Sequence, residues 1–395
     1  MTEDLGRFSC YTTGPEKSLE ILETARTKCP VAFSEAHEGF YVLLNYREVL
    51  AAMLDHERFS SKPQVLRPML PRKPIPALEM DPPQHRSWRA IFDGAMSEGR
   101  VAELEPFVRR DIGRHIDGFV RNGACDIVRE LTQPVPAGAI CRMMGIDEEL
   151  VPRVRESALA MFAAQGNPME FGKRQAEFAE LTVTEVHKRR ASPRDDYLTR
   201  LATVIVEGLP LDDDDYVVLL AACLGAGHHS TTAAMTTLIV DVFSDDNIRD
   251  SLNRDPLLVP IAVEESLRLR PPFYGFFRRA TKTSTVAGVE IYAGSDVYLS
   301  WAAANRDPTL FADPLEFRLD RRSNPHLSFG AGIHACPGTA LARMELRVLL
   351  EELLRRLPDL RVETRNPAYQ FGGGDYVFIP SLNVSFTPAR PDMRD

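Results

Sequence analysis

The spacing of apolar residues along the chain predicts mostly helices, with short strands after the first helix and in the last third. Residues 15–28 have the periodicity of an amphipathic helix, and VAFSE and GFYVLLNY follow as two strands of a small sheet. From about Arg47 to Pro260, helical repeats such as VAELEPFVRRDIGRHIDGFV dominate, separated by capping and helix-breaking residues. After Pro271, STVAGVEIYAGSDVYLSW and DYVFIPSLNVSF alternate like antiparallel strands. We therefore expect a mainly α fold with a small β-rich region.

The stretch from Lys62 to Pro83 interrupts the helical pattern. It holds seven prolines, which fix backbone angles and lack the N–H group that helices and sheets need. We therefore expect a long irregular loop there, and loops of this length in compact proteins usually serve a function.

The run from Tyr216 to Val240 contains no Asp, Glu, Lys or Arg and is long enough to cross a bilayer. Its centre, GAGHHSTT, carries histidines and hydroxyl side chains, which are costly against lipid. The pattern therefore favours a buried helix that carries a site over a helix that spans a membrane.

Composition narrows the classes of function. The net charge is -9 over 395 residues, which argues against nucleic acid as a partner because phosphate binding needs clustered lysine and arginine. The six cysteines, at positions 10, 29, 125, 141, 223 and 336, include no C-x-x-C pair, so neither a disulfide framework nor a zinc site is indicated. The N-terminal MTEDLGRFSC lacks the apolar segment of a secretory signal. These features predict a cytoplasmic protein without a membrane anchor.

The segment HLSFGAGIHACPGTALARMELRVLLEELL gives the strongest indication of chemistry. Glycines surround one cysteine, Cys336, and a strongly helical pattern begins just after it. Because a helix N-terminus favours an anion, it would stabilise Cys336 as a thiolate able to bind a metal. Gly330, Gly332 and Gly338 would let the backbone approach a flat, bulky cofactor.

Two other interpretations of this segment are open. A lone cysteine is usually a buried structural residue. The letters GAGIHA also match the G-x-G-x-x-A fingerprint of dinucleotide sites, but that fingerprint follows a strand, whereas the polar RRSNPH precedes it here.

The segment resembles the signature F-G-x-G-x-H-x-C-x-G of the cytochrome P450 family, through Phe329, Gly330, Gly332, His334, Cys336 and Gly338. The resemblance continues in matching order from about residue 30 to 390. It implies the cytochrome P450 fold as a single domain over residues 1–395. A small β-rich part would occupy about 30–60, the helical bulk about 85–270, and a β-rich region with the haem ligand about 271–395. Haem b would lie between the central helix and the cysteine loop, with Cys336 as the iron ligand.

Glu265 and Arg268, in AVEESLRLRPP, lie three residues apart on one face of a predicted helix. Alone they would form an exposed ion pair worth ~0.5 kcal/mol. The segment resembles the family's E-x-x-R helix, whose pair is completed by an arginine before the cysteine, here Arg321 in FRLDRR. The resemblance implies a buried triad that holds the cysteine loop in place.

The haem propionates need cationic or hydrogen-bonding partners, because carboxylates at the edge of an apolar pocket are costly. The resemblance supplies four candidates: His85 and Arg89 of MDPPQHRSWR, Arg278 of FFRRAT, and His334 of the signature. For each of them considered alone, the alternative interpretation is a solvated surface residue.

The central helix departs from the family pattern A-G-x-[Asp/Glu]-Thr, in which the acid relays protons and the hydroxyl positions a water. This chain has, in order, Ala226, Gly227, His228, His229, Ser230 and Thr231, of which Ala226 and Gly227 would face the cofactor. An imidazole with an ordinary pKa of about 6.5 donates and accepts protons near neutrality. We expect His229 to replace the acid, with Ser230 or Thr231 as the nearby hydroxyl. The alternative is a structural histidine, hydrogen-bonded in a helix groove.

The resemblance places the substrate between the proline-rich loop, Ala226 with its neighbours, and a set of aromatic residues. These are Phe273, Tyr274, Phe276, Tyr376 and Phe378, although each is equally suited to packing in the core. Such a lining indicates a small apolar or aromatic substrate, either free or bound to a carrier.

The implied activity is that of a monooxygenase, which inserts one oxygen atom from dioxygen into its substrate. Electrons would come from NAD(P)H through a ferredoxin and its reductase, docked near Arg86 and Arg343. Because the acid is missing, two alternatives stay open. One is a peroxide-using or otherwise atypical catalyst of oxidative coupling or rearrangement, and the other is a haem-thiolate protein that binds a ligand without turnover.

Overall fold

The computed structural model describes residues 6, 8–9, 13–67, 69, 73–164, 168–364, 367–372 and 376–389, and Cys10 lies outside them. The α helices of the described chain are α1 (Pro15–Arg26), α2 (Tyr46–Leu54), α3 (Gln84–Asp93), α4 (Glu98–Phe119), α5 (Pro134–Met144), α6 (Val151–Ala163), α7 (Pro168–Ala191), α8 (Tyr197–Thr203), α9 (Asp213–Phe243), α10 (Asp246–Arg254), α11 (Val259–Leu269), α12 (Trp301–Ala304) and α13 (Thr339–Arg356). The helix expected over residues 15–28 and the mostly helical middle of the chain are thus confirmed.

The strands are short and lie mainly near the N-terminus and in the last third of the chain. They are β1 (Val31–Ser34), β2 (Phe40–Leu43), β3 (Phe59–Ser60), β4 (Ala124–Asp126), β5 (Ile205–Val206), β6 (Leu209–Pro210), β7 (Phe276–Ala280), β8 (Ser284–Val286), β9 (Val289–Ile291), β10 (Asp296–Leu299), β11 (Arg361–Val362), β12 (Gln370–Phe371), β13 (Val377–Phe378) and β14 (Asn383–Ser385). The strands expected before residue 45 and after Pro271 are therefore present.

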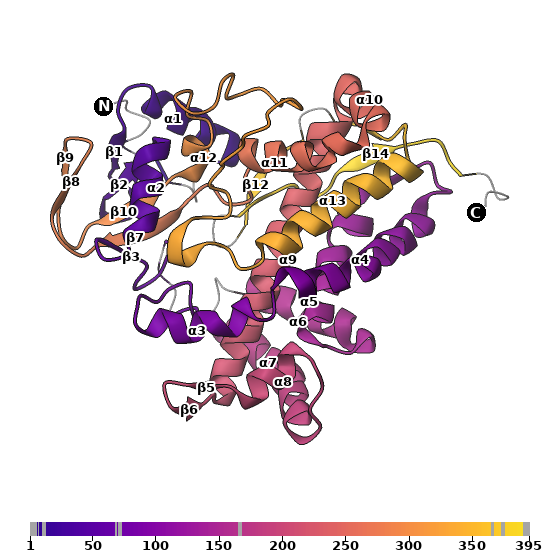
Figure 1. The fold of residues 1–395 in the computed structure, drawn as a ribbon, viewed down its shortest axis with the longest axis horizontal. Helices are drawn as coiled ribbons and strands as arrows, with labels where there is room; N and C mark the ends of the chain where they lie inside the picture. The colour runs from indigo at the N-terminus through magenta and orange to yellow at the C-terminus, as the bar shows by residue number, and fades with distance from the viewer. Residues whose placement is uncertain are drawn as a thin grey trace.

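One sheet of five strands, in the order β1-β2-β10-β7-β3, joins the two ends of the chain. Strand β10 runs parallel to β2 and antiparallel to β7, so the segment after Pro271 completes the sheet begun at residue 31. The rings of Phe40, Phe277 and Tyr298 pack on this sheet, with 5.0 Å between the centroids of Phe40 and Phe277. Figure 1 shows this sheet with α1, α2 and α12 on one side of the molecule, and α4 to α9 with α13 on the other.

The helix α9 is the axis of the helical part. Its N-terminus is capped by Asp212, whose side chain accepts from the N–H of Asp215 while the Asp215 carboxylate accepts from that of Asp212. Helices α5, α7, α11 and α13 pack against it. Among the described residues α9 is the helix long and apolar enough to cross a membrane, yet half of its most apolar stretch is buried inside the fold. Its burial is that of a core helix.

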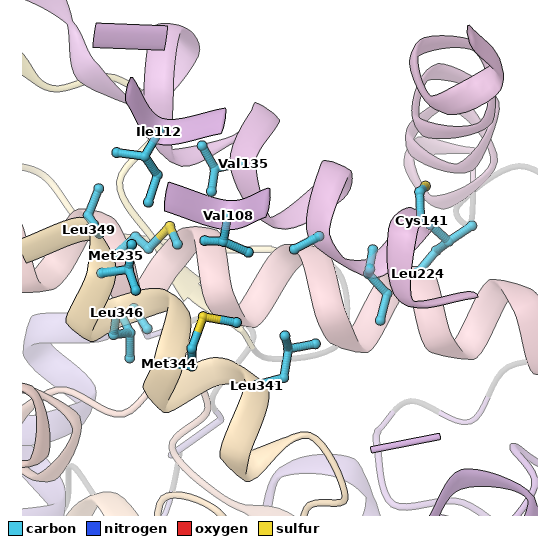
Figure 2. Close-up of a cluster of buried hydrophobic side chains, with 14 of the residues drawn as sticks. Val108, Ile112, Val135, Cys141, Leu224, Met235, Leu341, Met344, Leu346 and Leu349 are labelled. Atoms are coloured by element: carbon cyan, nitrogen blue, oxygen red, sulfur yellow. The ribbon is translucent and has the colours of Figure 1, made fainter. Parts of the chain in front are cut away.

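Apolar side chains of α4, α5, α9 and α13 meet in the main core, as Figure 2 shows. The labelled residues are Val108, Ile112, Val135, Cys141, Leu224, Met235, Leu341, Met344, Leu346 and Leu349. Full burial of such a side chain contributes roughly 1.5–3 kcal/mol of hydrophobic stabilisation. This packing fixes α13, and with it the loop that precedes α13, relative to α9.

The proline-rich stretch from Lys62 to Pro83 contains no helix or strand in its described residues, as the sequence predicts. The buried carboxylate of Glu79 organises it by accepting from the N–H of Val65 at 3.1 Å and of Ile75 at 2.8 Å. Because both donors belong to the loop itself, the loop is folded back around one charged group.

Candidate active site

The loop around Cys336 is shaped by glycines and closed by a backbone hydrogen bond. Gly330 and Gly332 have φ angles of 70° and 68°, a left-handed conformation that residues with a Cβ rarely adopt. At Gly332 a Cβ would also lie 3.0 Å from the carbonyl oxygen of Met53 in α2. The Cys336 N–H donates to the Phe329 carbonyl at 2.8 Å. The chain between Leu299 and Gly330 forms no strand, so the dinucleotide interpretation of GAGIHA is wrong.

The side chain of Cys336 opens into a cavity of about 1270 Å³ inside the fold. Helix α13 begins just after the cysteine, at Thr339, as expected. Burial raises the pKa of the Cys336 thiol, while the Gly338 N–H, the Thr339 side chain and the guanidinium groups of Arg89 and Arg343 counteract that rise. A cation bound beside the sulfur would favour its thiolate form.

Elements that are far apart in the sequence line this cavity. Its walls come from the proline-rich loop, from α5, α6, α7, α9 and α12, from β7, and from the cysteine loop, through residues such as Val65, Ile140, Leu159, Phe171, Val217 and Trp301. The surface of the cavity is mainly apolar. It therefore suits an apolar guest better than a charged one.

The residues of α9 that differ from the family pattern face the same cavity. Ala226, Gly227, His229, Ser230 and Thr231 all line the cavity. The Ser230 hydroxyl donates to the Ala226 carbonyl at 2.6 Å, so its lone pairs stay available as acceptors. Burial lowers the pKa of His229, which favours its neutral form, while a hydrogen bond to the backbone of Gly225 partly counteracts that fall.

The neighbouring His228 points elsewhere, because adjacent helical residues project about 100° apart. Its Nε2 lies 3.0 Å from the carbonyl oxygen of Gln133, and burial lowers its pKa to about 4. His228 is therefore a structural residue between α9 and the start of α5. Close packing there also explains Gly227, where a Cβ would lie 2.8 Å from Cδ1 of Ile140.

Arg278, in β7, is a buried arginine that lines the cavity. Its Nη1 donates to the carbonyl of Phe277 at 2.9 Å, and none of the described carboxylates forms an ion pair with it. Burial lowers its pKa to about 10. Because a buried guanidinium without a carboxylate is costly, this position favours an anionic group in the cavity.

His85 and His334 lie side by side, with 4.8 Å between their ring centroids. His334 is held on both sides, since Nδ1 lies 3.1 Å from the Ala77 carbonyl and Nε2 lies 3.3 Å from Oγ of Ser61. Both ring nitrogens of His85 are buried, and neither has a hydrogen-bond partner within the described part of the chain. Burial lowers the pKa of both histidines, that of His334 to about 3.

These groups fit the haem that the sequence predicts. Arg278 and His85 are buried polar groups that need acceptors or anions, and the two propionates of a haem would supply them. Cys336 provides the sulfur on the adjoining wall. The fourth expected propionate partner, Arg89, instead donates to the carbonyl of Ala335 at 2.6 Å and of Ile333 at 3.3 Å. Its guanidinium thus braces the cysteine loop while lining the cavity.

The three residues of the expected buried triad come together. Arg268 binds Glu265 with two hydrogen bonds of 2.8 and 2.7 Å, and both side chains are 0% exposed. Nε of Arg321 lies 3.0 Å from Oε1 of Glu265. Arg268 also donates to the carbonyls of residues 305, 314 and 316, which belong to the chain that leads to the cysteine loop. The pair is therefore not the exposed one that the spacing alone would allow.

The expected aromatic lining is partly correct. Phe273, Phe276 and Tyr376 line the cavity. Tyr274 does not, because alternate residues of an extended chain face opposite sides, and its ring packs on Phe371 with 5.6 Å between centroids. Phe378 is also absent from the lining and stacks on Tyr376. The prediction was wrong for these two residues.

Sequence reasoning missed Asp81, which orders the loop beside His334. Its carboxylate accepts from the Ser61 N–H and hydroxyl, each at 3.2 Å, and from the hydroxyl of Ser60. The sequence did contain a signal, since Asp81 belongs to MDPPQHRSWR and lies four residues before His85. The apolar wall residues on α5, α6 and α7 gave no such signal, because their spacing is that of any packed helix.

Comparison with known proteins agrees with this site. The family model described as Cytochrome P450 matches residues 250–367. A steroid C26-monooxygenase from Mycolicibacterium smegmatis is 32% identical over 360 residues, which cover 89% of this chain and 89% of that protein. The erythromycin C-12 hydroxylase of Saccharopolyspora erythraea is 33% identical over 356 residues, covering 87% and 88%.

Among solved structures, a cytochrome P450 from Chondromyces apiculatus superposes with a TM-score of 0.87 at 26% identity, covering 98% of this chain and 99% of that one. Fold and sequence thus agree over almost the whole length. The chain therefore belongs to the cytochrome P450 family, as a monooxygenase of the bacterial type whose family chemistry depends on a haem held by a cysteine thiolate.

Proposed function

We propose that this chain inserts one atom of dioxygen into an apolar or aromatic organic substrate. The reaction converts substrate RH, dioxygen, NAD(P)H and a proton into ROH, water and NAD(P)⁺. The observation that carries the proposal is the mainly apolar cavity of about 1270 Å³, into which both Cys336 and the His229 segment open. Relatives named for acting on a steroid and on erythromycin support an organic substrate of this kind.

Bound haem would supply the iron that activates dioxygen, and thiolate ligation favours O–O cleavage. Cys336 would hold the iron, and Arg278 and His85 would bind the propionates. The electron donor is a ferredoxin with its reductase, which docks near Arg86 and Arg343, both exposed. Residues 1–395 act as one catalytic unit in the cytoplasm, on a substrate that is free or carried by a partner protein.

His229 takes the place of the family's acid. One ring nitrogen of its neutral imidazole is hydrogen-bonded to the backbone of Gly225, so the other nitrogen takes up a proton and then gives it up, which returns the imidazole to its neutral form. Ser230, whose own proton is engaged by Ala226, offers lone pairs to a water on this path. Thr231, which also lines the cavity, is the second hydroxyl.

Replacing Arg278 by leucine should weaken haem binding. The propionate would lose its buried cation, a loss of about 2–5 kcal/mol for a desolvated charge pair. Transfer of haem to excess apomyoglobin measures this as a faster release. Arg279→Leu is the matched control, because Arg279 is partly exposed and its Nε pairs with Asp296 at 2.9 Å. Equal release rates in the two variants would contradict the role of Arg278.

Replacing His229 by alanine should lower the product formed per NAD(P)H about 100-fold, in the range for the loss of a general acid–base group. The lost electrons should appear as hydrogen peroxide. The control is His187→Gln, since His187 is a surface histidine bound to Asp213 at 2.9 Å. If His229→Ala keeps its coupling, the relay role is wrong.

The function as a whole is tested by comparing two ways of driving the reaction. A diverse library is first titrated into the ferric protein, and a shift of the Soret band toward high spin identifies a ligand. That ligand is then incubated either with dioxygen, NAD(P)H and a ferredoxin system, or with hydrogen peroxide alone. Product in the first arm supports the proposal. Product in the second arm alone favours the peroxide-using alternative that the missing acid suggests, and no product in either favours ligand binding without turnover.

A further inference from the structure

A short hairpin near the C-terminus brings an aromatic ring against His229. Tyr376 stacks on the imidazole, with 5.1 Å between ring centroids and 30° between ring planes. Both rings line the cavity. Nearly parallel rings at this distance make an attractive offset contact. His229 therefore meets the substrate space with one of its faces covered.

The hairpin holds Tyr376 firmly in this place. The backbone around it is hydrogen-bonded to two segments, since the Val377 N–H donates to the Pro272 carbonyl at 2.6 Å and the Gly372 N–H donates to the Tyr376 carbonyl at 2.8 Å. At Gly372 a Cβ would lie 2.0 Å from Cε1 of Tyr376, so only glycine leaves room for the ring. Phe378 stacks on Tyr376 with 5.0 Å between centroids. The tyrosine ring is thus supported from several directions.

A second ring that contacts His229 is fixed as well. The ring of His228 meets that of His229 edge-on, with 5.1 Å between centroids, and Gln133 anchors His228 through its carbonyl. The imidazole of His229 accordingly contacts two rings that other elements hold in place. One of its nitrogens is hydrogen-bonded to the backbone of Gly225, so the direction of the other nitrogen depends on the plane of the ring, and rotation of the ring would misdirect it.

We propose that Tyr376 is a positioning residue for the reaction, whose ring fixes the plane of the His229 imidazole so that the nitrogen not bonded to Gly225 stays aligned with the proton path. This inference rests on the proposed relay role of His229. Stacking requires a flat ring and not a hydroxyl, so phenylalanine serves at position 376 and leucine does not. Tyr376 also forms part of the wall that substrate touches, so binding of substrate and alignment of the relay share one ring.

Three variants separate alignment of His229 from a general disturbance of the hairpin. In Tyr376→Leu the product formed per NAD(P)H falls about tenfold, as expected for a misaligned catalytic group, and hydrogen peroxide rises in step. In Tyr376→Phe the ratio returns to within about twofold of wild type, because the stacked ring remains. The control is Phe371→Leu in the same hairpin, whose ring packs on Tyr274 outside the cavity, and it should keep the wild-type ratio of product to NAD(P)H. Equal losses of coupling in Tyr376→Leu and Phe371→Leu would overturn the proposal.

A second measurement distinguishes failure of this inference from failure of the relay. In the diamagnetic ferrous carbon monoxide complex, the ring current of Tyr376 shifts the His229 Cε1 proton upfield, and His229→Gln identifies that signal by NMR. The upfield shift is expected to persist in Tyr376→Phe and to vanish in Tyr376→Leu. In addition, Tyr376→Leu should cause no further loss in a His229→Ala background. If the shift vanishes but coupling is retained, positioning is refuted, and if His229→Ala alone keeps its coupling, the relay is refuted first.

Discussion

Replacing Cys336 by alanine is expected to abolish the far-red-shifted Soret band that the reduced protein shows with carbon monoxide. That band reports thiolate ligation of haem iron, and Cys336 is the cysteine of the signature loop that opens into the cavity. The other cysteine that lines the cavity, Cys223, lies within α9 and not beside a helix start. Its thiol is buried and lies 3.8 Å from the Tyr197 hydroxyl, and burial raises its pKa to about 12.

Cys223→Ala is therefore the matched control and should keep the band. Both variants remove one thiol from the wall of the same cavity, so a general disturbance of the pocket would affect them alike. A band that persists in Cys336→Ala would show that the iron ligand lies elsewhere, and a band lost equally in both variants would show a general disturbance of the pocket. Absorption spectra of the purified proteins, normalised to haem content, decide between these outcomes.

The sequence predicts this loop well because its geometry is encoded locally. Gly330 and Gly332 adopt left-handed angles that follow from residue type, and the apolar period after Cys336 marks the helix that follows it. The same holds for the strands β8, β9 and β10, whose alternation is visible over a few residues. Structure that depends on interactions within one short segment can thus be predicted from a single sequence.

Long-range contacts cannot be predicted in this way. His228 and His229 are identical in type and adjacent, yet only tertiary packing against Gln133 turns one into a structural residue and leaves the other in the cavity. Tyr274 and Tyr376 look alike as aromatic candidates, but the face of the chain on which each lies depends on the pairing of Phe273 with Tyr376. These contacts decide which aromatic residue touches the substrate, and they cannot be predicted from composition.

Replacing Arg268 by leucine is expected to lower the free energy of unfolding by about 3–5 kcal/mol, because it leaves the charge of Glu265 buried without its main partner. Both side chains are 0% exposed, so water cannot compensate. The substitution also removes hydrogen bonds outside this ion pair. Arg268 donates at 3.0, 2.6 and 3.0 Å to three carbonyls of residues 305, 314 and 316, which precede the cysteine loop. Haem incorporation should therefore fall together with stability.

Urea unfolding followed by circular dichroism, with haem content measured in parallel, tests this expectation. Arg268→Lys keeps the charge but lacks the planar fork that reaches Glu265 and the carbonyls together, so its stability should lie between wild type and the leucine variant. Arg174→Leu is the control, because Arg174 joins Glu170 and Glu177 on the exposed face of α7 and should unfold like wild type. If Arg268→Leu unfolded like Arg174→Leu, the triad would be an incidental ion pair. A loss of stability in Arg268→Leu but not in Arg174→Leu would instead show that α11 holds the cysteine loop through the buried charge of Glu265.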